Sequence, residues 1–237
     1  MQKILSFMRK AIEDYNMIEE GDKIGVALSG GKDSISLLMG MKTLQRFYPK
    51  NFELIALSIN PGFEFFNKDF LEKTCKNLDI PLFIEDTNIK EIVFDVRQEK
   101  NPCSLCANFR RGALNSVAIR EGCNKIALGH NEDDVLETFL LNLFYTGSIN
   151  TFAPTSYMDR SQITLIRPLI YAPEKSIKAF VKRNNVEIMD KVCPMDGVSK
   201  REDIKKMISD LKLEIPHIRS NLYGAIQRNI KEWKKPE

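Results

Sequence analysis

Two groups of residues in this sequence could do chemistry, a glycine-rich loop and a set of cysteines. The loop lies in GVALSGGKDSISLL, residues 25–38, where an apolar run is followed by glycines and then by a helical pattern. Glycines in such a loop let backbone N–H groups approach phosphate oxygens, and the N-terminus of the following helix adds a favourable field. We therefore expect a phosphate-binding site at residues 29–34.

The loop does not follow the two common phosphate-binding patterns. A Walker loop needs a glycine five residues before Gly31 and a serine or threonine after Lys32, but Val26 and Asp33 stand at those positions. The dinucleotide-binding pattern G-x-G-x-x-G is not matched either. An acidic residue directly after the lysine therefore needs an explanation of its own.

The cysteines are the second group. The pair Cys103-x-x-Cys106 lies before a predicted helix, and Cys193 follows far downstream with a proline after it. Structural zinc wants four ligands, and the two histidines, His130 and His217, are not spaced as a pair. A redox dithiol is the second interpretation. The third is a [4Fe–4S] cluster held by three thiolates, with one open iron that could bind a sulfide.

Apolar runs alternate with helical patterns along most of the chain, which predicts an α/β fold with a doubly wound parallel sheet and added helices at both ends. A polar, turn-rich stretch at 147–162 predicts a long loop near a site. Two basic helices are predicted within 199–233, around a proline. The expected strands are 23–29, 52–59, 82–85, 124–129 and 163–169. The expected helices are 33–47, 66–79, 107–122 and 131–144 between these strands and 173–185 after the last one.

Composition and charge narrow the function classes. No apolar run approaches the roughly 18 residues of a membrane span, and the N-terminus reads as an amphipathic helix, so we expect a cytoplasmic protein without a membrane partner. Five cysteines, an odd number, argue against a disulfide scaffold. Residues 160–237 carry 17 Lys+Arg against 10 Asp+Glu, whereas residues 1–159 carry 18 against 22. A basic C-terminal third suggests RNA or only a solvated helical surface.

The hexapeptide S-G-G-K-D-S at 29–34 resembles the pyrophosphate loop of the N-type ATP pyrophosphatases, which adenylate a substrate and release pyrophosphate. The resemblance implies ATP and Mg²⁺ as cofactors, with Asp33 holding the magnesium over the phosphates. Backbone amides, Ser29, Ser34 and Lys32 would hold the pyrophosphate. The alternative is a plain glycine turn between a strand and a helix.

A second segment, ALGHNEDDVLET at 127–138, agrees with this resemblance. Gly129, His130, Asp133 and Asp134 match a segment that helps to close the ATP site in the same superfamily, at the sheet edge where ligands bind. Asn131 stands where the pattern has a second histidine, and a capping or core role is the alternative for His130. The nucleotide-binding residues implied are Ala27, Ser29, Gly30, Gly31, Lys32, Asp33, Ser34, Ser58, Gly129, His130 and Asp134.

The order of all these pieces is similar to that in the tRNA 2-thiocytidine synthetase family, over roughly residues 20–230. The pieces are the loop, Pro102-Cys103-x-x-Cys106, the arginine pair at 110 and 111, KIALGHNEDD, and Cys193-Pro194. In that family the three matching cysteines bind an oxygen-sensitive [4Fe–4S] cluster. The resemblance therefore implies catalytic roles for Asp33, Lys32, Cys103, Cys106 and Cys193, with the three cysteines as metal ligands. Cys75 and Cys123 read as buried structural thiols.

The activity implied is ATP-dependent 2-thiolation of cytidine 32 in the tRNA anticodon loop, through an adenylated base. A sulfide on the open iron would then replace AMP. The partners implied are tRNA, a sulfur donor (a cysteine desulfurase or free sulfide) and, in a homodimer, a second copy of the chain. Arg110 and Arg111 would contact RNA or phosphates, or simply form a solvated helix start. The domains expected are an N-terminal helix at 1–20, the ATP domain at 21–190 and a basic helical extension at 191–237.

Three alternatives remain open at this point. The same scaffold could thiolate a uridine, act on a small thio-compound or remove sulfur from a thiolated base. Cys103 and Cys106 could instead work as a persulfide and disulfide pair without metal. The chain could also be a non-catalytic, cluster-bearing sensor that binds a nucleotide or RNA, although such a sensor has no need of Asp33 and Asp134.

Overall fold

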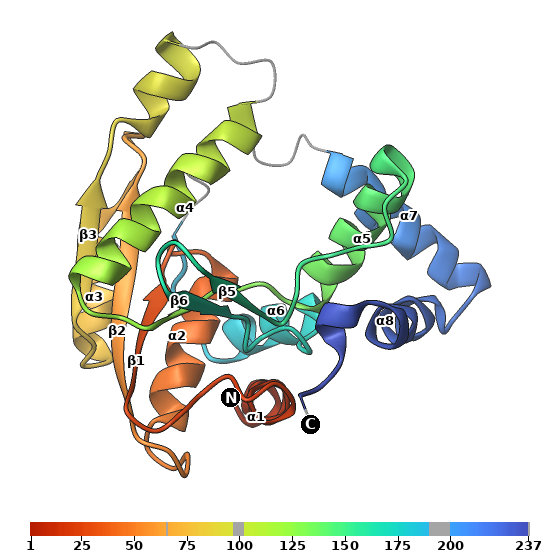
Figure 1. Cartoon of the computed structure of the whole chain (residues 1–237), viewed down its shortest axis with the longest axis horizontal. Helices are drawn as coiled ribbons and strands as arrows, with labels where there is room; N and C mark the ends of the chain where they lie inside the picture. The colour runs from red at the N-terminus through yellow and green to blue at the C-terminus, as the bar shows by residue number, and fades with distance from the viewer. Residues whose placement is uncertain (65, 97–101, 190–199, 237) are drawn as a thin grey trace.

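The centre of the structure is a six-stranded sheet with the order β3-β2-β1-β4-β6-β5 (Figure 1). This computed structural model describes residues 1–64, 66–96, 102–189 and 200–236. Five strands are parallel, and β5 pairs antiparallel to β6 at the edge. The direction of winding reverses between β1 and β4, which confirms the doubly wound fold. The strands are β1 (Asp22–Ala27), β2 (Phe52–Asn60), β3 (Leu82–Asp86), β4 (Lys125–Ala127), β5 (Thr155–Met158) and β6 (Ile163–Ile166).

Helices cover both faces of this sheet. One face packs against α4 (Pro102–Arg120) and the π-helical segment η1 (Glu91–Val96) in one apolar cluster. The larger core lies on the other face, under α1 (Gln2–Asp14), α2 (Lys32–Leu44), α3 (Lys68–Asn77) and α6 (Glu174–Arg183). Three further helices pack against one another at the end of the molecule away from β3 (Figure 1): α5 (Glu132–Thr146), α7 (Lys200–Glu214) and α8 (Ile218–Asn229).

The N-terminal helix is held by one apolar face. Its buried residues are Ile4, Met8, Ala11 and Ile12, which recur at helical spacing, and they belong to the larger core. The helix packs against α2 and α6. Burial of this face is therefore what docks the first helix on the ATP domain expected at 21–190.

The end of the chain returns to the same place. Trp233, in the short 3₁₀ helix η2 (Lys231–Trp233), is 1% exposed and donates its indole N–H to the carbonyl of Phe152 at 3.2 Å. Its ring meets the edge of Tyr223 at 5.4 Å and of Tyr15 at 6.3 Å between centroids. The two termini consequently lie close together (Figure 1), and Lys235 pairs with Asp14 at 2.8 Å.

Two local expectations need correction. The stretch 147–162 is not all loop, because Thr155–Met158 form β5. This strand lies at the edge of the sheet, where it needs only one pairing partner and keeps its outer side solvated. It therefore lacks a strong apolar pattern in the sequence. The expected helix at 107–122 begins instead at Pro102, since proline is well accommodated in the first turn of a helix. Cys103 and Cys106 therefore lie within α4, one turn apart.

Two further expectations concern a membrane span and the domain boundaries. In the described part of the chain, no helix combines the length and the apolar character needed to cross a membrane. The division at 20 and 190 stays a prediction. The second boundary adjoins residues 190–199, which lie outside the described ranges.

Replacing Trp233 with alanine should destabilise the whole fold, because the indole joins the first and last helices in one core. We expect a loss of about 3–5 kcal/mol in the free energy of unfolding, measured by urea denaturation. Phe47→Ala is the matched control, since Phe47 is 53% exposed and its loss should cost under about 0.5 kcal/mol. Equal effects of the two substitutions would contradict this account of the core.

Candidate active site

The loop between β1 and α2 lies at the carboxyl edge of the sheet, next to the reversal between β1 and β4, where open α/β sheets bind ligands. Gly30 adopts φ +82°, and a Cβ there would lie 2.8 Å from the Cβ of Met189, so glycine is required. Ser34 Oγ accepts hydrogen bonds from the N–H (3.2 Å) and the hydroxyl (3.1 Å) of Ser29, which closes the turn. No side chain of the described residues caps α2, so its first N–H groups remain available to an anion.

Lys32 is held by two carboxylates. Its Nζ lies 2.8 Å from Asp33 Oδ2 and 3.1 Å from Glu174 Oε1. Burial alone would lower the pKa of Lys32, but the two carboxylates outweigh it and raise the pKa to about 12. Glu174 in turn binds Lys205 at 2.9 Å and Lys178 at 3.0 Å. Burial opposes its ionisation, yet the three lysines lower the pKa of Glu174 to about 2, so Lys32 and Glu174 both stay charged at neutral pH.

The segment after β4 touches the start of α2. A Cβ on Gly129 would lie 3.2 Å from the backbone carbon of Asp33 and 3.2 Å from the nitrogen of Ser34, which leaves room only for glycine without displacement. Asn131 caps α5 by accepting from the N–H groups of Asp133 and Asp134, and its amide donates to Asp33 Oδ1 at 3.2 Å. The asparagine that departs from the expected pattern therefore holds the expected magnesium ligand in place.

Acidic residues in the first turn of α5 pair with arginines of the C-terminal helices. Arg219 contacts Asp133 at 2.9 Å and Glu132 at 3.0 Å. Arg201 contacts Asp134 at 3.1 Å and, more loosely, Glu137 at 3.4 Å. Burial raises the pKa of Glu137 to about 7, although Arg201 pulls in the opposite direction. These pairs fix α7 and α8 onto the end of α5.

His130 lies three residues after the end of β4, and its ring contacts that of Phe152 in a tilted arrangement with 4.8 Å between ring centroids. Burial, followed by the positive charges of Arg167, Arg201 and Arg111, lowers the pKa of His130 to about 3. Its Nδ1 has no hydrogen-bond partner among the described residues. The imidazole is therefore neutral at physiological pH and suited to hydrogen bonding, not to carrying charge.

A cavity of about 590 Å³ lies between the end of the sheet and α4. Ala27 and Ser29 line it from the first strand and the loop, and Ala107 lines it from α4, directly after Cys106. Apolar side chains from β2, β5, β6, α4 and the segment after β4 form most of the remaining wall, and Arg110, Arg111 and Arg167 also line the cavity. The loop and the cysteine-bearing helix thus face one space.

Ser58 and the cysteines Cys103 and Cys106, which the sequence analysis expects at the site, do not line this cavity. Ser58 is 1% exposed, and its neighbours Leu57 and Ile59 line the cavity instead, because alternate residues of a strand face opposite sides of the sheet. Cys103 is exposed and Cys106 is half-buried, whereas Cys193 lies outside the described residues. No group of three potential metal ligands occurs within the described ranges.

The other two cysteines match the expectation of structural thiols. Cys75 in α3 and Cys123 before β4 are 1% and 6% exposed. Burial raises the pKa of each thiol to about 11. Both side chains therefore stay protonated within the apolar clusters.

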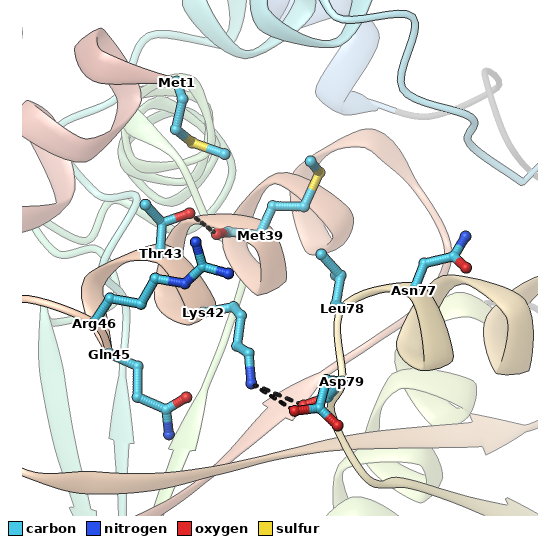
Figure 2. Close-up of a pocket in the computed structure, with 9 residues that line it drawn as sticks. All are labelled: Met1, Met39, Lys42, Thr43, Gln45, Arg46, Asn77, Leu78 and Asp79. Carbon is cyan, nitrogen blue, oxygen red and sulfur yellow. Dashed lines mark hydrogen bonds and ion pairs between the residues drawn. The ribbon is translucent and has the colours of Figure 1, made fainter.

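A second cavity, of about 450 Å³, lies at the far end of α2 (Figure 2). Lys42 points to Asp79 there, with its Nζ 2.8 Å from the carbonyl oxygen and 3.8 Å from Oδ2. Met39 and Leu78 contribute apolar surface, and none of the expected site residues takes part. Ligands of open α/β sheets bind at the carboxyl ends of the strands, so we place the active site at the cavity beside the loop.

Sequence reasoning missed several residues that the fold brings to this site. Asn131 carried a usable signal, since a cap residue followed three positions later by Asp134 forms a capping box. Glu174, Arg201 and Arg219 carried none, because their partners lie tens of residues away in the chain.

Comparison with known proteins agrees with this geometry. A family model described as a PP-loop domain matches residues 2–212. The tRNA-cytidine(32) 2-sulfurtransferase of Syntrophotalea carbinolica is 41% identical over 228 residues, which cover 95% of this chain and 88% of the relative. This chain is a PP-loop protein of the tRNA-cytidine(32) 2-sulfurtransferase family. The resemblance that the motifs indicate is thereby confirmed.

Further similarities extend over most of this PP-loop protein. The tRNA-cytidine(32) 2-sulfurtransferase of Pelobacter propionicus is 40% identical over 92% of the chain and 82% of the relative. Among solved structures, the U34-tRNA thiolase NcsA from Methanococcus maripaludis, determined with its [4Fe-4S] cluster, superposes with a TM-score of 0.78. That pair is 27% identical and covers 94% of this chain and 78% of the thiolase.

Gly129→Ala should weaken nucleotide binding with little effect on folding. The added methyl group meets the backbone at Asp33 and Ser34, so the PP-loop must shift by a few tenths of an ångström. We expect affinity for a non-hydrolysable ATP analogue to fall about tenfold by calorimetry, with a stability cost of about 1 kcal/mol. Gly112→Ala is the control, because nothing lies within 4 Å of that helical position. Unchanged affinity in the Gly129 variant would refute the close contact as a positioning device.

Proposed function

We propose that the protein uses ATP to replace the C2 oxygen of cytidine 32 in tRNA with sulfur. The observation that carries this proposal is the shared cavity: Ser29 of the PP-loop and Ala107, next to Cys106, line the same space. The loop proposed to bind ATP and the helix that carries Cys103 and Cys106 thus both border one cavity, which supports the proposal. Family membership supports the same chemistry, since the relatives named above are tRNA-cytidine(32) 2-sulfurtransferases.

The first step would activate the base. The C2 oxygen forms a bond to the α-phosphorus of ATP, and the bond between that phosphorus and the bridging oxygen to the β-phosphate breaks, releasing pyrophosphate. The open N–H groups of α2, Ser29, Ser34 and Lys32 would hold the pyrophosphate. Lys32 can contribute without leaving either carboxylate, because an ammonium has three donors and only two are used on Asp33 and Glu174.

Magnesium fits the carboxylate of Asp33. Asp33 Oδ1 accepts from Asn131, and Oδ2 contacts Lys32, so the carboxylate is fixed at the first turn of α2, beside the open N–H groups. A carboxylate oxygen at this position is a ligand that Mg²⁺ prefers, and the ion would neutralise phosphate charge. Asp134 is the second acidic residue at the site, but its carboxylate is engaged by Arg201 and by the N–H of Asn131.

The chemistry of the two described cysteines also suits an iron–sulfur cluster. Cys103 and Cys106 lie one turn apart on α4, so their side chains share a helix face, and thiolates are the usual ligands of such clusters. We propose Cys193 as the third ligand. When bound, a [4Fe–4S] cluster would supply sulfur at the sulfide level, taken from free sulfide or, with a two-electron reductant such as a pair of thiols, from the persulfide of a cysteine desulfurase. The C2–sulfur bond forms, the C2–oxygen bond breaks, and AMP leaves with that oxygen.

The basic C-terminal helices would serve two purposes. Arg201, Lys205 and Arg219 point inward and hold the carboxylates of the site, so they are not free for RNA. The exposed side chains of Lys206, Lys212 and Arg228 would contact tRNA phosphates. An unstacked anticodon-loop base can enter a pocket of this size without opening a helix.

Thiolation of a uridine is the second candidate, because the structural neighbour NcsA is a U34-tRNA thiolase. Both reactions put sulfur on a pyrimidine base of tRNA, so the activating residues would be the same. Mass spectrometry of nucleosides from tRNA treated with the protein, ATP and sulfide separates the two. A 2-thiocytidine product supports the proposal, and 2-thiouridine would replace it.

Cys103→Ala, Cys106→Ala and Cys193→Ala should each abolish thiolation while leaving ATP binding intact. After anaerobic reconstitution, the wild type should hold about four irons per chain with a broad absorption band near about 400 nm, and the variants should lose both. Cys75→Ala is the matched control, since that buried thiol should affect stability but not iron content. A variant without iron that still thiolates tRNA would refute the cluster.

Asp33→Asn should reduce magnesium-dependent pyrophosphate release about 100-fold or more, because the substitution removes a fixed charge but keeps the size of the side chain. Binding of tRNA should not change, since Asp33 lies in the PP-loop and away from the exposed basic helices. Asp79→Asn, at the far end of α2, is the charge-matched control. Full pyrophosphate release by the Asp33 variant would exclude this carboxylate as the metal ligand.

A further inference from the structure

Arg167 is a buried charge that neither the sequence motifs nor the steps above explain. It follows β6 directly and is 6% exposed. Its Nη1 donates to the carbonyl of Ala153 at 2.7 Å and to Ser156 Oγ at 3.3 Å, and its guanidinium lies 5.1 Å from the ring centroid of Phe152. Nε, in contrast, has no hydrogen-bond partner among the described residues. A buried guanidinium with unused donors is costly unless something binds it.

The charges around Arg167 make this cost larger. The same cavity is lined by Arg110 and Arg111 of α4, and the described residues that line it include no aspartate or glutamate. Burial, together with the positive charge of Arg111, lowers the pKa of Arg167 to about 10. Like charges that share a cavity destabilise each other unless an anion lies between them. The contact with Phe152 offsets only part of this, since a cation–π interaction is weaker than a buried ion pair.

Two other residues that line the cavity each have a buried polar atom without a partner within the described residues. These atoms are Nδ1 of His130, from the segment after β4, and Oδ1 of Asn115, from α4. Buried polar groups in native proteins are nearly always hydrogen-bonded. Three residues with such atoms, from three separate segments, line one cavity that Ser29 of the PP-loop also lines. Their arrangement suits a polar, anionic ligand.

A purely structural role for Arg167 accounts for only part of these contacts. Anchoring the segment that leads into β5 uses Nη1 and the face of the guanidinium. This anchoring does not use Nε of Arg167. It also does not require the arginines at positions 110 and 111 of the cavity wall. A planar guanidinium presents paired donors that match the oxygens of a phosphate.

We propose that Arg167, with Arg111, binds a phosphate group of a substrate in this cavity. The inference deepens the proposed function and rests on it. The phosphate belongs either to the nucleotide, as its α-phosphate, or to the RNA, as a phosphodiester beside the target cytidine. In both cases the arginines would hold the negative charge close to the reacting C2 carbon, on the side of the cavity away from the pyrophosphate.

The test is a double-mutant cycle between the arginine and the phosphate. One arm compares AMP with adenosine. The other compares an anticodon stem-loop with the same RNA carrying neutral methylphosphonate linkages on both sides of the target nucleotide. Affinities of the wild type and of Arg167→Met are measured by calorimetry. The wild type should lose about tenfold in affinity when the relevant phosphate is removed or neutralised, and the variant should lose almost nothing.

Three further variants test whether the effect of Arg167→Met comes from lost phosphate binding, from a displaced side chain or from the change in the protein's net charge. Ser156→Ala removes one anchoring partner of Arg167 and should keep the preference for the phosphate. Arg160→Gln removes an exposed arginine from the same hairpin and should also keep it. Arg111→Met, at an exposed position on α4, should reduce the same preference and keeps the proposal testable if Arg167→Met does not fold.

The outcomes distinguish the two sources and the two proposals. Coupling in the AMP arm identifies the nucleotide phosphate, and coupling in the RNA arm identifies the phosphodiester. A wild type that binds both ligands, with no coupling in either arm, would overturn the phosphate subsite and leave the sulfurtransferase proposal standing. A wild type that binds neither AMP nor the stem-loop would overturn both.

Discussion

The contact between the end of β4 and the start of α2 is the constraint on which the rest of the site depends. Gly129 lies against the backbone of Asp33 and Ser34, and the amide of Asn131 reaches the Asp33 carboxylate. Two segments about a hundred residues apart therefore form one rigid unit at the reversal point of the sheet. The position of the PP-loop relative to α5, and so to every residue that α5 carries, follows from this contact.

Charge is distributed unevenly around that unit. On one side, carboxylates at the starts of α5 and α6 are neutralised by lysines and arginines from α2, α7 and α8. Most of these pairs are partly buried, which strengthens the attraction between their charges. The C-terminal helices are therefore held at the site by ion pairs as well as by apolar packing. The basic character of the C-terminal third therefore has an internal use in addition to any role in RNA binding.

On the other side, the cavity under α4 carries arginines and no acidic residue among the described ones. On the side of Lys32, the positive charges of the site are thus paired with carboxylates. On the side of the cavity, the arginines lack acidic partners among the described residues and attract negative charge. This asymmetry suits a reaction in which an anionic nucleotide and an RNA must approach each other. Much of the cavity lining is apolar, which strengthens electrostatic interactions in the pocket.

The sequence by itself determined the chemistry-bearing motifs and the kind of fold. Local spacing was sufficient for the loop at 29–34, for the segment that begins at Gly129 and for the alternation of strands and helices, because each depends on neighbours in the chain. The exact start of α4 and the edge strand β5 escaped prediction, since proline tolerates the first turn of a helix and an edge strand needs little apolar pattern. Only the tertiary structure decided that Asn131 supports Asp33, that Glu174 holds Lys32, and that Arg167 lines the cavity. Those relations depend on distances between residues far apart in the chain, which packing sets and local sequence does not encode.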